Sequence, residues 1–400
     1  MDRSIKQMIG EQENELDQIL RYWTVNALDE KNGGFVGAID GSGHVISKAS
    51  KGAILNARIL WSFSAAYNYT RKNKYLSMAD LAYKYLVDFF IDKECGGVYW
   101  EVDDEGKIVN SRKQAYAQGF AIYGFTEYYR ATNNKQSLIL AQEIYSIIEQ
   151  YYWDEKYGGY IEALSKHWHP LADMRLSEKE ANWPKSMNTH LHILEPYTNL
   201  YRCWKDPALA QNIRRIIRIF LDKIIDNKTA HFNLLFDYDW TVKTSTISYG
   251  HDIEGSWLLF EAAEALGDQQ LLDEMKVVAV RMVDVTSKEG TDKDSSLFYE
   301  KEGNHLDTDK HWWPQAEAMV GYINAWQITS KQRYLDETKR LWGFICGHII
   351  DRKNGEWFWR VNKEGYPYQE DEKVGFWKCP YHNTRALIEV CSRLKASMDN

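Results

Sequence analysis

Helical periodicity divides this sequence into twelve stretches that follow one another in pairs, and this alternation constrains the fold more than any other feature. Between the two stretches of each pair lies a short aromatic or glycine-bearing segment. These segments begin roughly 60–75 residues apart, a period typical of repeat architectures. Each alternates apolar and polar residues as a short hairpin does, and they start at Gly33, Gly96, Gly158, Phe232, Ser296 and Gly355. The helical stretches are residues 5–22, 54–69, 75–90, 115–129, 137–152, 186–204, 212–225, 253–266, 271–283, 316–326, 334–349 and 384–394.

The connections between the predicted helices are unequal. Even-to-odd links are short, for example from Tyr69 to Tyr75, whereas odd-to-even links contain the hairpin segments. If the helices alternate in direction, all six even helices begin at the end that carries the hairpins, and such loops commonly carry function. We therefore predict an all-α fold: a single (α/α)6 barrel domain over residues 1–400, with the even helices inside and short β-hairpins at the active-site end. A solenoid of helix pairs is the alternative.

Composition argues against several classes of protein. The net charge of −8 and the lack of clustered Lys and Arg disfavour nucleic-acid binding. No apolar run approaches the ~18 residues of a membrane-spanning helix, and the acidic N-terminus has no signal-peptide core. The five cysteines are scattered without a CxxC pair, which is typical of free thiols in a reducing compartment. We expect a cytoplasmic protein without a nucleic-acid or membrane partner.

Polar side chains occur near the starts of the even helices. Arg58 lies among apolar neighbours in AILNARILW, and burying a guanidinium is costly unless it binds an anion or a carboxylate. Tyr116 opens the next even helix. In KSMNTHLHILE, Asn188 and His192 share one helical face, whereas His190 points elsewhere. Such a pair must be hydrogen-bonded in the core or must meet water or a ligand.

Two histidines at helix starts are suited to proton transfer. His251 and Glu254 are three residues apart in SYGHDIEGSWLL, so the carboxylate can fix the histidine tautomer, and Gly250 suits a tight entry into the helix. His382, in FWKCPYHNTRA, follows a proline that marks a first turn. A helix N-terminus disfavours imidazolium and keeps this ring neutral. Metal-binding spacings such as HExxH and phosphate-binding glycine loops are missing, so we expect neither a metal nor a nucleotide cofactor.

Aromatic residues make up 14% of the chain and include 16 tryptophans, which serve either as core packing or as platforms for sugar rings. Trp312 and Trp313 precede Glu317 in HWWPQAEAM, and Trp377 precedes the last even helix. Tryptophans at loop–helix junctions are well placed to stack on a sugar, although we expect core packing for at least one of the adjacent pair.

Four motifs, KSMNTHLHILE, SYGHDIEGSWLL, HWWPQAEAM and FWKCPYHNTRA, resemble those of the N-acylglucosamine 2-epimerase superfamily, and the likeness spans essentially the whole chain. The SYGHDIE segment favours the cellobiose-epimerising branch. The resemblance implies an (α/α)6 barrel that works without a metal. It also implies 2-epimerisation of the reducing-end glucose of a β-1,4-linked disaccharide through a cis-enediolate. The candidate substrates are cellobiose, lactose and mannobiose.

The same resemblance implies roles for residues of this chain. His251 and His382 would be the acid–base pair, and Glu254 would orient a catalytic histidine. We expect the substrate to be bound by the following residues: Arg58, Tyr116, Asn188, His192, Glu254, Trp312, Trp313, Glu317 and Trp377. We expect a monomer, with a dimer as the alternative.

Other functions stay open at this point. N-acylglucosamine 2-epimerase and mannose isomerase are sister activities of the superfamily, and an aldose–ketose isomerase would share the enediolate but protonate C1. An (α/α)6 glycoside hydrolase would need two essential carboxylates, and no spacing selects a pair from Asp103, Asp237 and Asp239. A non-catalytic carbohydrate-binding protein would use the tryptophans and have little use for the histidines.

Overall fold

A computed structural model describes residues 3–178 and 180–399. Within these residues there are twelve α-helices, and each overlaps one of the helical stretches predicted from the sequence. They are α1 (Arg3–Asn26), α2 (Ala53–Thr70), α3 (Asn73–Tyr85), α4 (Ala115–Thr132), α5 (Lys135–Tyr151), α6 (Met187–Cys203), α7 (Pro207–Ile219), α8 (Tyr249–Leu266), α9 (Gln269–Glu289), α10 (Trp312–Thr329), α11 (Gln332–Phe344) and α12 (Tyr381–Asp399). Three outer helices continue into a π-helical turn: η1 (Leu86–Phe90), η2 (Phe220–Ile224) and η3 (Ile345–Ile349).

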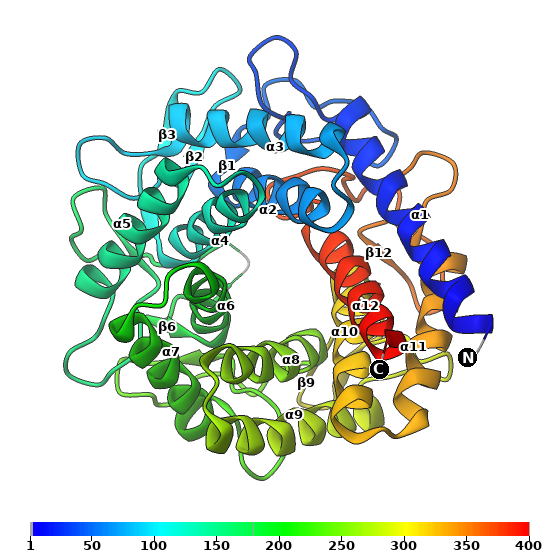
Figure 1. The fold of residues 1–400 in the computed structure, drawn as a ribbon. Helices are drawn as coiled ribbons and strands as arrows, with labels where there is room; N and C mark the ends of the chain where they lie inside the picture. The colour runs from blue at the N-terminus through cyan, green and yellow to red at the C-terminus, as the bar shows by residue number, and fades with distance from the viewer. Residues whose placement is uncertain (1–2, 179, 400) are drawn as a thin grey trace.

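The even-numbered helices form a closed inner ring. Each contacts the next, from α2 through α4, α6, α8 and α10 to α12, and α12 contacts α2. The odd-numbered helices lie outside this ring, with α3 against α2 and α1 against α12 (Figure 1). This arrangement confirms the predicted (α/α)6 barrel and its assignment of the even helices to the interior.

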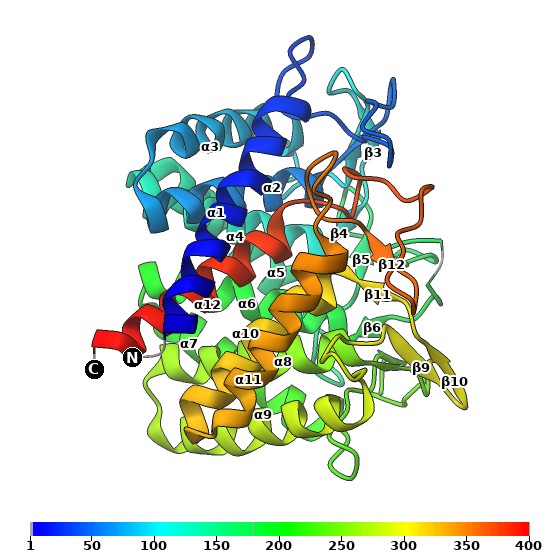
Figure 2. The ribbon, with the colours of Figure 1, turned by 90° about the vertical axis from the view of Figure 1, so that its right-hand side faces the viewer.

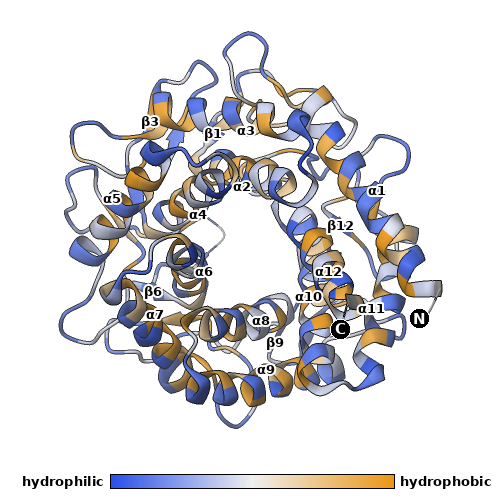
Figure 3. Ribbon diagram, in the orientation of Figure 1, coloured by the Kyte–Doolittle hydropathy of each residue, from blue (hydrophilic) through white to orange (hydrophobic). Residues whose placement is uncertain are grey.

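Residue patterns explain which helices are inside. The first fourteen residues of α2 are all buried, because neighbours cover every face of an inner helix. The outer helix α7 instead buries one apolar face, which includes Ile213 and Ile217, and presents arginines to solvent. Hydrophilic residues accordingly follow the outer rim of the ring in Figure 3. Among the described residues, no helix has the length and apolar character needed to span a membrane.

Short antiparallel strands join neighbouring repeats at one end of the barrel. A two-residue strand directly precedes each of five inner helices and pairs with the hairpin of the next repeat. The pairs are β1 (Lys51–Gly52) with β2 (Glu101–Val102), β4 (Lys113–Gln114) with β5 (Ala163–Leu164), β6 (Lys185–Ser186) with β7 (Leu235–Phe236), β8 (Ile247–Ser248) with β9 (Glu300–Glu302), and β11 (Lys310–His311) with β12 (Arg360–Val361). Strands β3 (Ile108–Asn110) and β10 (His305–Asp307) extend two of these sheets. Figure 2 places the strands at the end opposite the two termini.

An ion pair with a buried lysine recurs at this end in five of the six repeats. An aspartate that caps the turn after an outer helix binds a lysine that lies just before the next inner helix, or shortly before it in the last repeat. The pairs are Lys51–Asp29, Lys113–Asp92, Lys185–Asp154, Lys310–Asp292 and Lys373–Asp351, with N–O distances of 2.6–2.8 Å. In the remaining repeat His231 contacts Asp252 at 2.7 Å. These contacts attach the starts of the inner helices to the surrounding turns.

Candidate active site

Side chains from the starts of the inner helices meet at the strand-bearing end of the barrel. Arg58 of α2 donates to the Tyr116 hydroxyl of α4 at 2.7 Å, and the Tyr116 ring lies 4.9 Å from that of His192 on α6. Trp313 of α10 contacts both predicted acid–base histidines, with ring centroids 4.7 Å from His251 and 5.7 Å from His382. The structure therefore brings together predicted site residues from all six inner helices.

His382 is the second residue of α12 and has a carboxylate partner. Its Nδ1 lies 2.6 Å from Glu317 Oε1 and 3.9 Å from Glu254 Oε1. When Nδ1–H donates to a carboxylate, Nε2 carries the free lone pair and can accept a proton. Burial, with Arg58 and Arg385 nearby, holds the pKa of His382 well below its ordinary value. The ring is therefore neutral near pH 7 and available as a base.

His251 has a different partner from the one its sequence spacing indicated. Its Nδ1 lies 2.7 Å from Ser248 Oγ. Glu254, three residues along α8, instead accepts from Arg385 at 2.5 Å and lies beside His382. Glu254 is thus near a predicted acid–base histidine, but the one from α12, because its face of α8 turns toward that helix. Burial, with His192 nearby, lowers the pKa of His251 to about 3.

A fully buried arginine, which sequence reasoning missed, connects the carboxylates of this site. The Arg385 guanidinium binds Glu254 and Glu317 through Nη2, at 2.5 Å and 2.6 Å, and Glu195 through Nη1. Glu195 also accepts from His192 Nδ1 at 3.0 Å. Burial raises the pKa of Glu254 to about 7 and that of Glu317 to about 6, whereas Arg385, against the effect of burial, lowers that of Glu195 to about 2.

The sequence contained a weak signal for this network. Arg385 follows His382 by three residues, and Glu195 follows His192 by three, so each shares a helical face with a predicted site residue.

The network also changes the role expected for Glu317. Its carboxylate accepts from His382, Arg385 and Trp257, which makes it a support of His382 more than a group free for substrate.

Arg58 carries a buried positive charge that is not paired with an acid. Its side chain is 3% exposed, and it lies over the Phe120 ring at 4.2 Å. In the described part of the chain its Nε has no hydrogen-bond partner, and Arg58 takes part in no ion pair with a carboxylate. Of the two uses weighed for this arginine, the geometry favours binding of an anionic group over a structural salt bridge.

On α6, Asn188 and His192 share one helical face and His190 lies on another, as the sequence predicts. The Asn188 side-chain oxygen is buried, and no partner for it is found among the described residues. It lies one turn before His192, on the same face. His190 instead accepts from the Tyr160 backbone N–H at 2.9 Å and approaches the Ser186 carbonyl at 2.7 Å, so it is a satisfied core residue. Asn188 therefore keeps hydrogen-bonding capacity for a ligand.

The tryptophans have unequal surroundings. Trp313 is partly exposed beside the two histidines, whereas Trp312 is buried against Trp359, with ring centroids 4.9 Å apart. Trp377 is partly exposed and lies 6.0 Å from the Tyr116 ring. Gly250 lies inside the first turn of α8, and a Cβ there would come within 2.5 Å of the Trp313 ring. That glycine is needed for close packing of Trp313 and not for the tight entry expected from the sequence.

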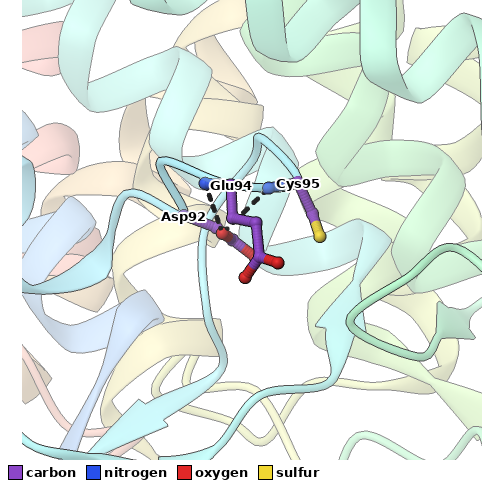
Figure 4. Close-up of side chains that lie close together, drawn as sticks. All are labelled: Asp92, Glu94 and Cys95. Atoms are coloured by element: carbon purple, nitrogen blue, oxygen red, sulfur yellow. Dashed lines mark hydrogen bonds between the residues drawn. The ribbon is translucent and has the colours of Figure 1, made fainter.

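Among the described residues, two groups of side chains have the composition to hold a metal ion, but their carboxylates bind arginine or lysine side chains instead. In the group Glu254, Glu317 and His382, both carboxylates accept from Arg385. The second group, Asp92, Glu94 and Cys95, lies in a turn after η1 (Figure 4). There Asp92 accepts from the backbone N–H groups of Glu94 and Cys95 and binds the buried Lys113 at 2.8 Å. Asp92 therefore belongs to one of the recurrent aspartate–lysine ion pairs.

The stability of the protein should fall as the pH is lowered, with a contribution from His251. Its pKa is about 3 in the folded state, against 6.5 for the unperturbed ring. Between these values the unfolded chain binds a proton that the folded ring does not, so the free energy of unfolding decreases as the pH falls. Thermal melts of the wild type and His251→Gln between about pH 7 and pH 4 should show a shallower decline for the variant. Equally steep declines would contradict the low pKa.

Comparisons with known proteins indicate one family along nearly the whole chain. The family model for N-acylglucosamine 2-epimerase (GlcNAc 2-epimerase) matches residues 33–386. A cellobiose 2-epimerase of Bacteroides fragilis is 47% identical over 393 residues, which cover 98% of this chain and 99% of the relative. A D-mannose isomerase of Marinomonas mediterranea is 21% identical and covers 96% of both chains. The solved structure of cellobiose 2-epimerase from Bacillus thermoamylovorans matches with a TM-score of 0.93 at 39% identity, covering 97% of this chain and 100% of that one.

The family match extends over most of the sequence and includes every residue of the site described above. The inner helices and hairpins carry these residues. The solved structure from Bacillus thermoamylovorans matches the fold that they form over its full length. The chain therefore belongs to the N-acylglucosamine 2-epimerase family.

Proposed function

We propose that this protein is a cellobiose 2-epimerase, which interconverts glucose and mannose at the reducing end of β-1,4-linked disaccharides. Cellobiose would become glucosylmannose, and lactose would become epilactose. The observation that carries the proposal is the placement of two histidines against one tryptophan, with the unpaired Arg58 on a neighbouring helix. The similarity to cellobiose 2-epimerases over nearly the whole chain supports it.

The chemistry of epimerisation accounts for this set of groups. In the open-chain sugar, the C2 hydrogen is acidic because it lies beside the C1 aldehyde. One histidine removes this proton through Nε2, and the electron pair moves to O1 to form a cis-enediolate. The second histidine, protonated at Nε2, returns a proton to the opposite face of C2, since a single base would return it to the same face. Arg58, with Asn188 and His192, would stabilise the charge that develops on the sugar oxygens.

The substrate should be a disaccharide. Besides Trp313, the partly exposed Trp377 offers an aromatic surface for a second sugar ring, and it lies next to Trp100 with centroids 6.1 Å apart. We expect kcat/KM to be higher for cellobiose and lactose than for glucose or N-acetylglucosamine. Initial rates followed by chromatography of the products test this. A higher kcat/KM for a monosaccharide would move the protein to a sister activity of the family.

Catalysis should be unaffected by chelation. The Arg385 guanidinium occupies the position between Glu254 and Glu317 that a cation would need, and it binds both carboxylates. After dialysis against EDTA, the enzyme should retain its full kcat with cellobiose. Loss of turnover that a divalent ion restores would contradict this expectation.

One experiment separates the remaining functions. Cellobiose is incubated with the protein in D2O, and the products are identified by NMR. An epimerase gives glucosylmannose with deuterium at C2, an aldose–ketose isomerase gives a ketose, and a glycoside hydrolase releases glucose. A carbohydrate-binding protein leaves the sugar unchanged. Only the first result supports the proposed function.

Two further properties belong to this proposal. Because one chain supplies every residue of the site, the protein should be active as a monomer. The five cysteines are free thiols, two of them buried, which fits a reducing compartment such as the cytoplasm.

A further inference from the structure

Ser248 occupies a helix-capping position but does not cap its helix. It is the second residue of β8 and directly precedes α8, where a serine hydroxyl ordinarily accepts a backbone N–H from the first turn. Ser186 holds the equivalent place before α6, and its hydroxyl accepts from the Thr189 N–H at 3.0 Å. The Ser248 hydroxyl makes no such bond and lies 2.7 Å from Nδ1 of His251. The same residue type is thus used for capping in one repeat and for contact with a histidine in the other.

We propose that Ser248 is a positioning residue for the proposed epimerisation: its hydroxyl accepts from Nδ1–H of His251 and thereby leaves Nε2 free to accept the C2 proton. The proposal rests on the proposed function for its catalytic part. Ser248 is 3% exposed, so water does not compete readily for this hydrogen bond. The acids near it on the same helix are engaged elsewhere: Asp252 contacts His231, and Glu254 is bound to Arg385, so neither is available to take over the role.

The two histidines then differ in the partner that holds them. His382 donates from Nδ1 to the carboxylate of Glu317, which stabilises an imidazolium, whereas His251 faces a neutral hydroxyl. Among the described residues, the titratable groups that act on His251 from other helices are His192 of α6 and His382 of α12, and neither is an acid that would stabilise a positive charge on His251. A carboxylate at position 248 should therefore make His251 a stronger base.

The kinetic test compares Ser248→Ala with Ser248→Thr. Loss of one hydrogen bond should reduce kcat by about tenfold, with little change in KM, because the bond acts on the histidine and not on the substrate. Threonine keeps a hydroxyl and should restore most of kcat. The matched control is Asn134→Ala, which removes a side-chain cap from the outer helix α5 and should lower the melting temperature without changing kcat. If Ser248→Ala behaves like this control, the proposal is wrong.

A second measurement does not depend on turnover. Long-range ¹H–¹⁵N spectra of the histidine-labelled protein, with His251 assigned through His251→Gln, report which ring nitrogen carries the proton. The wild type should show the Nδ1–H tautomer, and Ser248→Ala should show a mixture. In Ser248→Asp the midpoint of the His251 titration should move to higher pH. An unchanged tautomer in Ser248→Ala, or an unchanged midpoint in Ser248→Asp, would overturn the positioning role. If the wild type epimerises no sugar, the proposed function fails, and these spectra still decide the hydrogen-bonding role of Ser248.

Discussion

His251→Ala and His382→Ala should each reduce epimerisation by at least about 100-fold while the protein stays folded, since a general acid–base group typically contributes about 10²–10⁴-fold. Both rings contact Trp313, and both have a pKa below the ordinary histidine value. Inversion at C2 needs a proton removed on one face and delivered on the other, so neither histidine can replace its partner.

The measurement is turnover of cellobiose in D2O, with circular dichroism to verify the fold. A variant that keeps the base facing the C2 hydrogen of a given epimer can still exchange that hydrogen for deuterium without inversion, and the other variant should do neither. His44→Ala is the matched control, because the His44 side chain is 81% exposed. It should retain wild-type activity. If either active-site variant keeps more than roughly a tenth of wild-type turnover, the two-histidine mechanism is wrong.

Arg385→Met should destabilise the protein by about 3–5 kcal/mol, the usual cost of removing one partner from a buried ion pair. The arginine is 1% exposed and binds three carboxylates, from Glu195, Glu254 and Glu317. Without the guanidinium, these acids would be left buried together without a compensating charge. Glu317 would then tend to be protonated and would support His382 less well, so kcat should also fall.

Urea denaturation of the wild type and the variant measures the loss of stability. Arg218→Met provides the control, because it breaks an ion pair with Glu274 in which the arginine side chain is 49% exposed. Exposed pairs contribute at most about 1 kcal/mol, so this control should remain close to the wild type. A loss below about 1 kcal/mol for Arg385→Met would show that the buried acids find other partners or become neutral at little cost.

The helices and hairpins could be predicted because their signals are local. Apolar residues recur at helical spacing both in an inner helix such as α2 and in an outer helix such as α7, so periodicity locates the helices of both kinds. The recurrence of a glycine or aromatic hairpin segment before each even helix then indicated the ring and the end at which the site lies. His251 and His382 were selected as candidate acid–base residues in the same way, since each is a polar residue within the first turn of a helix.

The partners of those residues were decided only by the tertiary structure. Sequence spacing paired Glu254 with His251, yet Glu254 binds Arg385 of α12, and His382 of α12 contacts Glu317 of α10. Spacing along a helix specifies which side chains share a face, but not which neighbouring helix that face meets. The meeting depends on how each helix is rotated about its axis when the ring closes, and that rotation is set by packing against residues more than a hundred positions away. For the same reason the recurrent aspartate–lysine contacts, whose partners lie in different elements, appeared only when the barrel had been assembled.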